Sequence, residues 1–292
     1  MQTVVAASFL AVILALLSRR VQSYLTKTLA ARPPLIFAVA VSLAAWWCAI
    51  AAAVHALNAP LAILILLYTL LPAACAFAVR HRVPPASIDF GIILLLWFPL
   101  EFSVGAAWIR KPAQGLLHLA AYGVAITLAL FLFLLFRRVE GMKYNLPLSA
   151  RDFLNPLIGF AIAAPVLIAV GRAFGFLDPF HLPARLSPMR LGSQFLLILA
   201  ATALPEEILF RGLIQNFLMQ KLGPRFLTLL LAGIIFGCAH LDNGPGPLPN
   251  WRYMMIATIA GVIYGKVFEK SSSIFASAGL HALVNTIKHN FF

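Results

Sequence analysis

The chain has 292 residues, of which 62% are hydrophobic and only 11% are charged. A soluble domain is usually about 45–50% apolar and about 25% charged, so this composition excludes an ordinary soluble protein. The formal net charge of +13 does not indicate nucleic acid as a partner, because Lys and Arg cluster at the ends of apolar runs. Basic loops of this kind orient membrane proteins, and we expect them to bind anionic lipid.

Apolar runs follow one another along the whole chain, separated by short basic or proline-containing breaks. A run of roughly 18–20 apolar residues can cross a bilayer, and a backbone that faces lipid must be helical or form a closed barrel. The sequence therefore predicts an all-α fold, a polytopic transmembrane helical bundle of about ten spans. The predicted spans lie near residues 2–18, 35–57, 59–79, 88–109, 116–136, 153–171, 191–220, 226–240, 252–268 and 274–290.

The longest stretch with several charges, RRVEGMKYNLPLSARD at 137–152, divides these spans into two sets of five. We expect an N-terminal transmembrane bundle at 1–140, to which no role is assigned, and a second bundle at 141–292. Gly233–Gly237 and Gly261–Gly265 have the small-xxx-small spacing that lets membrane helices approach closely, which predicts tight packing in the second bundle. We expect an integral, multi-pass protein of the cell membrane of a prokaryote.

Ionisable side chains within apolar spans are costly and indicate functional sites. In the first bundle Asp89 is expected at a membrane interface, and Glu101 and His118 are interpreted as a structural pair. The second bundle contains a larger set in ordered motifs: Glu206, Glu207, Arg211, His240 and His281.

The first of these motifs is PEEILFRG at 205–212. Glu207 and Arg211 are separated by four residues, so in a helix they share a face and are expected to form an ion pair. Glu206 points about 100° away from Glu207 around the helix. We therefore expect one carboxylate to be neutralised by the arginine while Glu206 remains available.

Two further motifs place polar residues on helix faces in later spans. Phe236 and His240 are four residues apart in FGCAH, and His281 and Asn285 are four residues apart in HALVN. Helices of one bundle can bring a carboxylate, two imidazoles and an amide together in a single polar pocket. The sequence therefore predicts a site built from three separate helices.

Such a pocket is suited to more than one chemistry. A carboxylate and a histidine can activate water as general bases, and a second histidine with an asparagine can stabilise an oxyanion, which together describe amide hydrolysis without a covalent intermediate. Glu206, His240 and His281 could equally hold a zinc ion that activates the water. A non-proteolytic alternative is a binding or transport site lined by the same residues. The sequence contains neither the HExxH of zinc proteases nor the GxSxG of serine hydrolases.

The ordered set EExxxR, FxxxH and HxxxN on successive apolar segments resembles the CAAX-protease and bacteriocin-processing family, also called CPBP or Abi. The resemblance covers about residues 190–292. It implies a glutamate-dependent intramembrane protease whose core is the bundle at 141–292.

The resemblance also implies roles for the motif residues. Glu206 and His240 would activate water, and His281 and Asn285 would form the oxyanion site. Glu207, Arg211 and Phe236 would support them. The implied partner is a membrane protein or a peptide substrate, and no cofactor is expected, with zinc on Glu206, His240 and His281 as the alternative.

Overall fold

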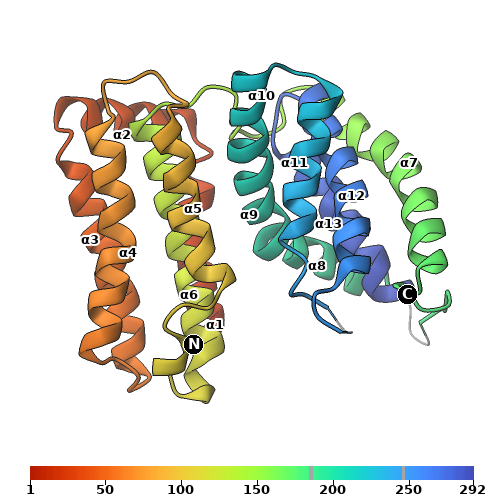
Figure 1. Cartoon of the computed structure of the whole chain (residues 1–292), viewed down its shortest axis with the longest axis horizontal. Coiled ribbons are helices and arrows are strands. Elements are labelled where there is room, and N and C mark those ends of the chain that lie inside the picture. Colours follow the sequence, from red (N-terminus) through yellow and green to blue (C-terminus); the bar gives the residue numbers. More distant parts are fainter. Residues whose placement is uncertain (184–186, 245–246) are drawn as a thin grey trace. The chain divides into compact units, whose positions relative to one another are not determined.

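The computed structural model describes residues 1–183, 187–244 and 247–292, and this part of the chain contains helices and no strand (Figure 1). The all-α fold predicted from the sequence is therefore confirmed. The chain divides into two compact units, Met1–Glu140 and Gly141–Phe292. The division coincides with the boundary expected within the charged stretch at 137–152, and each unit is described by itself below.

The first unit is built around one central helical rod, α6 continued by η2. Most of the side chains in this rod are buried, and it packs against α1, α3 and α5. The helices of the first unit are α1 Gln2–Ala15, α2 Arg19–Ala31, α3 Leu35–Ala53, α4 Ala59–Ala78, α5 Ser87–Glu101, the short η1 Ala106–Trp108, α6 Lys111–Ala129 and the π-helical η2 Leu130–Phe136.

Helix α2 was not predicted, because its sequence RRVQSYLTKTLAA lies outside the apolar runs. It turns away from α1 by 86° (Figure 1). Leu29 is buried on its inner side, whereas Arg20, Tyr24 and Lys27 are exposed. The helix is therefore amphipathic, with a basic outer face.

The predicted span at 88–109 is a shorter helix in the structure, because α5 ends at Glu101. The chain then turns through two residues with positive φ, Ser103 at 48° and Gly105 at 85°. A left-handed conformation of this kind ends helices, and glycine adopts it without steric cost.

Asp89 forms a buried ion pair with Arg137 at 2.8 Å. The guanidinium of Arg137 also donates to the carbonyl oxygens of Val79 and Arg82, at 2.6 and 2.9 Å. Asp89 accepts a further hydrogen bond from the backbone N–H of Ala86. The carboxylate of Asp89 is fully buried and ties the end of η2 to the loop between α4 and α5, and its expected place at a membrane interface stays a prediction.

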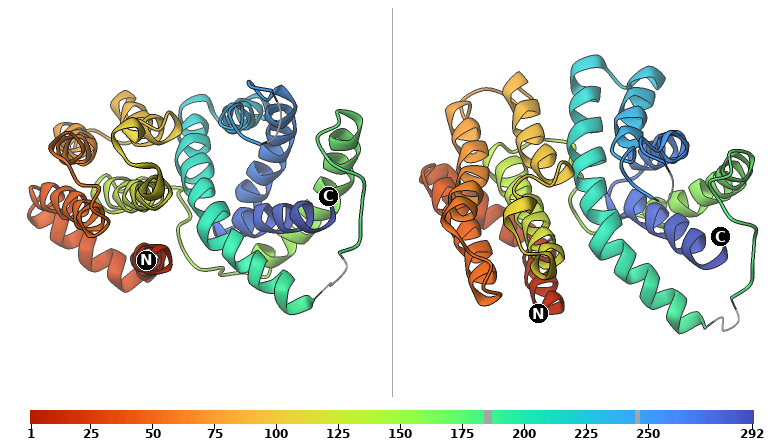
Figure 2. Two further views of the ribbon diagram at one scale, coloured as in Figure 1. Left: turned by 90° about the horizontal axis from the view of Figure 1, so that it is seen from below. Right: turned by 60° about the horizontal axis from the view of Figure 1, so that its bottom comes forward.

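The second unit contains a long helical rod, residues 188–222, that crosses α13 and also packs against α11. Figure 2 shows this rod as one continuous, curved ribbon. The helices of the second unit are α7 Arg151–Ala173, α8 Pro188–Ile198, η3 Leu199–Ala203, α9 Leu204–Glu207, η4 Ile208–Gln215, α10 Asn216–Leu222, α11 Phe226–Cys238, α12 Trp251–Lys270 and α13 Phe275–Phe291.

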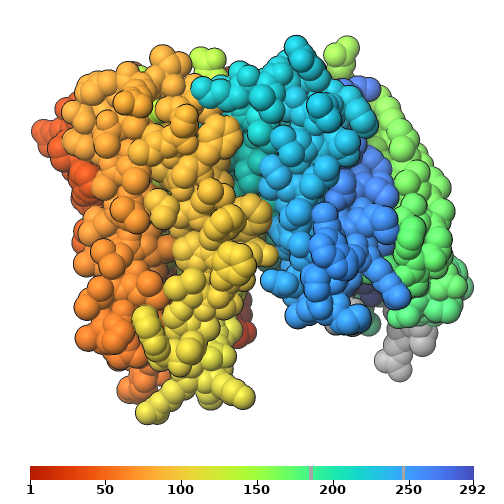
Figure 3. Space-filling model, viewed as in Figure 1, coloured from red at the N-terminus to blue at the C-terminus, as the bar shows by residue number. Residues whose placement is uncertain are grey.

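Helices α11 and α12 pack closely through the glycines of the small-xxx-small motifs. A Cβ atom on Gly237 would lie 2.6 Å from the carbonyl oxygen of Met254, and one on Gly261 would lie 3.2 Å from the Cα of Gly233. The tight packing predicted from these spacings is therefore present, and the side chains of α11 and α12 form one continuous surface in Figure 3.

The turn between α12 and α13 is fixed by two charged residues from the start of the unit. Lys143 donates to three carbonyl oxygens at the end of α12, those of Phe268, Glu269 and Ser271, at 2.7, 3.2 and 2.8 Å. Asp152 accepts from the backbone N–H of Ser272 at 2.6 Å. The bonds from Lys143 satisfy carbonyl groups that a helix end leaves free, and the bond to Asp152 satisfies a backbone N–H of the turn. Together they set the position from which α13 begins.

Within the described residues, four helices are long and apolar enough to cross a membrane, and the bent pair of α1 and α2 raises this to five. The four are α3, α4, α7 and the rod at 111–136. The other predicted spans also coincide with helices, although these are shorter or less apolar. A count of about ten spans thus stays a prediction.

Candidate active site

Glu206 and Glu207 lie near the middle of the rod at 188–222. They belong to α9, and the rod is π-helical on both sides of it, in η3 and η4. π-Helical turns are rare and occur frequently at functional sites. The side chain of Glu207 is fully buried, whereas that of Glu206 is 23% exposed. Glu206 is therefore the carboxylate that water or a substrate can reach.

Glu207 binds a partner with each of its two oxygens. Oε2 lies 3.1 Å from Nε of Arg211, and Oε1 lies 3.1 Å from Nδ1 of His281. The ion pair expected from the four-residue spacing is thus present, and all three side chains are buried. An ionised carboxylate only accepts hydrogen bonds, so Nδ1 of His281 is the donor. Arg211 fixes Glu207, and Glu207 in turn fixes the imidazole ring of His281.

The ring of Phe236 lies among the charged and polar residues of the site. Its centroid is 4.7 Å from the guanidinium carbon of Arg211, and it is 4.8 and 5.8 Å from the ring centroids of His240 and His281. A cation over an aromatic face is attracted by the ring quadrupole. Phe236 therefore packs against the cation and both histidines at once.

His240 follows α11 in the turn after its last residue. Its Nδ1 lies 2.9 Å from the carbonyl oxygen of Phe236, which can only accept, so Nδ1 carries the proton. The neutral ring then has its lone pair on Nε2, where it can act as a base or acceptor. The ring of Tyr253 meets His240 edge-on, with 4.7 Å between centroids.

His281 and Asn285 lie one turn apart on α13. Nε2 of His281 is 3.9 Å from Oε2 of Glu206, a separation too long for a direct hydrogen bond. One bridging water can span such a distance. The side of His281 opposite Glu207 thus faces the exposed carboxylate.

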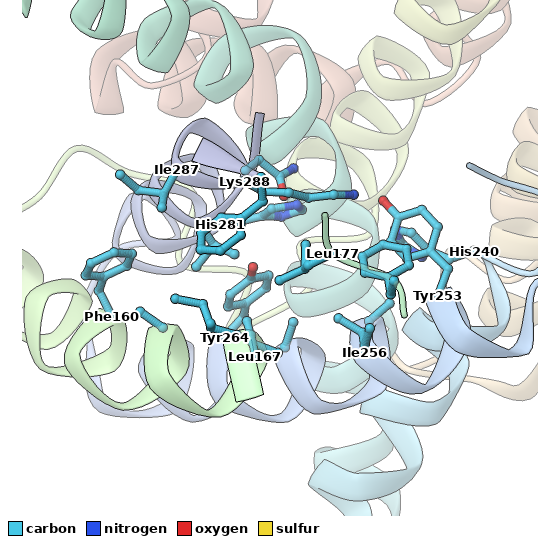
Figure 4. Close-up of a pocket in the computed structure, with 18 of the residues that line it drawn as sticks. Phe160, Leu167, Leu177, His240, Tyr253, Ile256, Tyr264, His281, Ile287 and Lys288 are labelled. Atoms are coloured by element: carbon cyan, nitrogen blue, oxygen red, sulfur yellow. The ribbon is translucent and has the colours of Figure 1, made fainter. Parts of the chain in front are cut away.

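A small cavity lies between α7, α12 and α13, with a volume of about 80 Å³. About 10–15 Å³ of such volume holds one water, so the cavity has room for several. Its lining includes four of the predicted residues: Phe236, His240, His281 and Asn285. Among the described residues, Glu206 does not line the cavity. Its carboxylate lies 3.9 Å from Nε2 of His281, which is a lining residue. Figure 4 shows the cavity, with His240 and His281 among the side chains that line it.

Three residues of the site were not predicted from the sequence. Tyr264 stacks on His281 at 4.8 Å between centroids, and Tyr253 contacts His240. Lys288 lines the same cavity. It lies seven residues after His281, on the same helix face, and this spacing was the signal that could have identified it. Nothing in the sequence marked the two tyrosines, because their positions depend on how α12 packs.

Glu101 and His118, which were interpreted as a structural pair, belong to the first unit and have other surroundings there. Glu101 accepts a hydrogen bond from the indole of Trp97 at 2.7 Å. His118 is exposed and lines a mainly apolar cavity of about 540 Å³ within that unit.

Among the residues that the structure describes, no group of three His, Cys, Asp or Glu side chains is placed to hold a metal ion. In this geometry Nδ1 of His281 and Nδ1 of His240 are both engaged in hydrogen bonds, which leaves one nitrogen of each ring to face the site.

Comparison with protein families gives one result. Residues 189–287 match the family of type II CAAX prenyl endopeptidases, Rce1-like. The resemblance expected for about residues 190–292 is thus confirmed over this CAAX-endopeptidase-like segment, which is about a third of the chain. The segment begins in α8, ends in α13 and contains the three motifs.

The first unit, α7 and Lys288 lie outside the CAAX-endopeptidase-like segment. Comparison with curated proteins found no match. Comparison with solved structures found no match either.

Proposed function

We propose that the protein is a membrane-embedded endopeptidase of the glutamate type, which hydrolyses a peptide bond of a membrane protein or peptide by means of activated water. One observation supports the proposal: His240, His281 and Asn285 line one small cavity, and the carboxylate of Glu206 lies 3.9 Å from Nε2 of His281. The similarity of residues 189–287 to CAAX endopeptidases supports the same class of reaction.

In the proposed reaction, Glu206 takes a proton from water while the water oxygen adds to the peptide carbonyl carbon. The oxyanion accepts hydrogen bonds from the amide of Asn285 and from Nε2–H of a protonated His281, whose ring is held by Glu207. Glu206 then transfers this proton to Nε2 of His240, and His240 passes it to the leaving nitrogen as the C–N bond breaks. The oxygen of the water then belongs to the new carboxyl end, and one of its protons belongs to the new amino end.

Among the described residues, the lack of a Ser, Thr or Cys side chain at the cavity supports direct attack by water. Cys238, in the same unit, is exposed and is not a lining residue. An acyl-enzyme would require one of these side chains.

The proposal is tested with purified protein in lipid nanodiscs and a library of peptides synthesised as free acids and as C-terminal amides, with products identified by mass spectrometry. We expect wild type to cleave a subset of the peptides. Asn285→Ala should cleave the same bonds about 10²–10³-fold more slowly, because one oxyanion donor is lost. Cleavage by Asn285→Ala at the wild-type rate would contradict the assigned oxyanion site.

We propose that this water activation needs no metal. The competing arrangement, zinc held by Glu206, His240 and His281, makes a different prediction for the same preparation. Stoichiometric zinc in the wild-type protein that is lost in His240→Ala would overturn the metal-free mechanism.

We further propose that all ten predicted segments lie within the membrane of a prokaryotic cell. Each of them coincides with a helix, and four or five are long and apolar enough to span by themselves. Of the remaining helices, α5, α11 and α13 are shorter than 18 residues, and α12 carries four charged residues.

We propose anionic lipid as the partner of one end of the first unit. The ring of Phe77 contacts those of Phe37 and Phe136 there, at 5.2 and 6.5 Å between centroids, so the loops after α2, α4 and η2 meet. All Lys and Arg residues of this unit except Arg110 and Lys111 belong to α2 or these loops, and all of them are exposed apart from Arg137, which is buried against Asp89. Basic clusters beside membrane helices attract anionic headgroups, by about 1 kcal/mol per residue.

We expect the wild-type protein to melt at a higher temperature in phosphatidylglycerol nanodiscs than in phosphatidylcholine nanodiscs. The double variant Arg20→Gln/Lys27→Gln should lose part of this difference. Arg110→Gln, which lies outside the basic cluster, is the matched control. An unchanged lipid dependence in the double variant would refute the assignment of α2 as a lipid-binding surface.

A further inference from the structure

Lys288 is a charged residue of the cavity that the proposed reaction does not use. It lies three residues after Asn285 and seven after His281, so all three project from one face of α13. Its Nζ is 4.4 Å from the ring centroid of Phe176 and 4.7 Å from that of Tyr253. Figure 4 shows its side chain extending across the cavity towards Tyr253, beside His240.

The ammonium group of Lys288 has no acidic partner in the described part of the chain, where its recorded contacts are the two aromatic rings. Cation–π contacts contribute about 0.5–2 kcal/mol and leave all three N–H donors of the ammonium without an acceptor. The ammonium is half-buried in a mainly apolar cavity. Its contacts within the protein therefore stabilise its charge only in part.

Lys143 shows how the same unit satisfies a lysine with a structural role. Its ammonium also lies over an aromatic ring, 4.6 Å from the centroid of Phe268. In addition it donates to three backbone carbonyl oxygens, at 2.7, 2.8 and 3.2 Å. The ring contacts are alike, and Lys288 differs in that its hydrogen-bond donors are directed into the cavity beside the two histidines.

We propose that Lys288 is a specificity-determining residue that binds a carboxylate of the peptide substrate close to the bond that is cleaved. This inference rests on the proposed function. A carboxylate supplies both the negative charge and the acceptors that the ammonium lacks, and a charge-assisted hydrogen bond is among the strongest in proteins. The carboxylate is either the free C-terminus of the substrate or the side chain of an Asp or Glu residue near the cleavage site.

The aromatic rings explain why the subsite is selective. Phe176 and Tyr253 hold the ammonium in place, so less side-chain entropy is lost when the carboxylate binds. They also cover part of the ammonium, which reduces its hydration and strengthens the electrostatic interaction. Tyr253 contacts His240 as well, so the bound carboxylate and the reacting bond are positioned by neighbouring side chains.

The test compares wild type, Lys288→Met and Lys288→Arg in nanodiscs. The probes are peptides cleaved by wild type, each made as the free acid, as the C-terminal amide, and with Asp or Glu replaced by Asn or Gln. We expect Lys288→Met to raise KM about ten- to a hundredfold for the carboxylate-bearing peptide and to change kcat less than about threefold, because one charge-assisted contact is lost. Lys288→Arg should retain most of the preference.

The amide and side-chain analogues identify the source of the carboxylate. If wild type discriminates only against the C-terminal amide, Lys288 binds the free C-terminus. If it discriminates only against the Asn or Gln analogue, Lys288 binds an acidic side chain of the substrate. Equal losses by Lys288→Met on all three probes, or a loss confined to kcat, would overturn the proposal. Lys266→Met, in an exposed surface pair with Glu269, is the matched control.

A binding measurement separates failure of this inference from failure of the proposed function. Fluorescently labelled acid and amide peptides are titrated against Glu206→Gln, with and without Lys288→Met. Carboxylate-dependent binding that disappears with Lys288→Met supports the subsite even if wild type cleaves no peptide, in which case the proposed reaction is wrong. Equal binding of the acid, the amide and the Asn or Gln analogue by Glu206→Gln, with all three peptides labelled in the same way, would refute the subsite whether or not cleavage occurs.

Discussion

Replacing Glu206 with glutamine is expected to slow peptide cleavage by about 10²–10⁴-fold, the range that a general base contributes. The substitution keeps the size of the side chain and removes only the carboxylate that takes the proton from water. Because the side chain is partly exposed and its neighbour Glu207 holds the ion pair, the fold should be retained. The measurement is kcat in nanodiscs, together with the melting temperature.

The matched control is Glu269→Gln, which removes a carboxylate of the same unit that pairs with Lys266 at the surface. It should cleave at the wild-type rate. Glu206→Gln with wild-type kcat, in a protein that melts normally, would show that Glu206 is not the base.

Replacing Arg211 with methionine is expected to lower the free energy of unfolding by about 3–5 kcal/mol, the cost of removing one partner of a buried ion pair. Glu207 would then remain as a carboxylate in a fully buried position, with His281 as its remaining charged neighbour. Cleavage should fall as well, because Glu207 orients the ring of His281. Stability is followed by thermal and denaturant unfolding in detergent.

The double variant Arg211→Met/Glu207→Gln should recover part of the lost stability, because it removes the unpaired charge as well as its partner. It should not recover cleavage, since His281 would still lack its carboxylate. Lys266→Met is the control for an exposed pair, for which a loss of about 0–1 kcal/mol is expected. Equal losses in Arg211→Met and Lys266→Met would contradict the structural role given to Arg211.

The sequence was sufficient to predict the helices of this protein, because long apolar runs have few alternatives to a helix in lipid. It did not reveal α2, whose polar sequence lies outside those runs. The early end of α5 was also missed. It depends on the positive φ of Ser103 and Gly105, and an apolar sequence does not show where such a turn falls.

The candidate site was predictable where its geometry is local. The spacing of Glu207 and Arg211 within one helix was enough to predict their ion pair. The contact of Glu207 with His281 joins residues 74 positions apart in the chain, so it depends on how α9 and α13 cross. The same holds for Tyr264 and Tyr253, which α12 brings against the two histidines.

The central claim is that Glu206 activates water for cleavage of a peptide bond in a membrane-associated substrate. The most direct test is a comparison of protein termini in membranes from cells that produce either wild type or Glu206→Gln at equal levels. We predict a new terminus that is present with wild type and absent with Glu206→Gln, and its sequence would identify the substrate. Identical sets of termini, with the variant folded and in the membrane, would contradict the proposed peptidase activity.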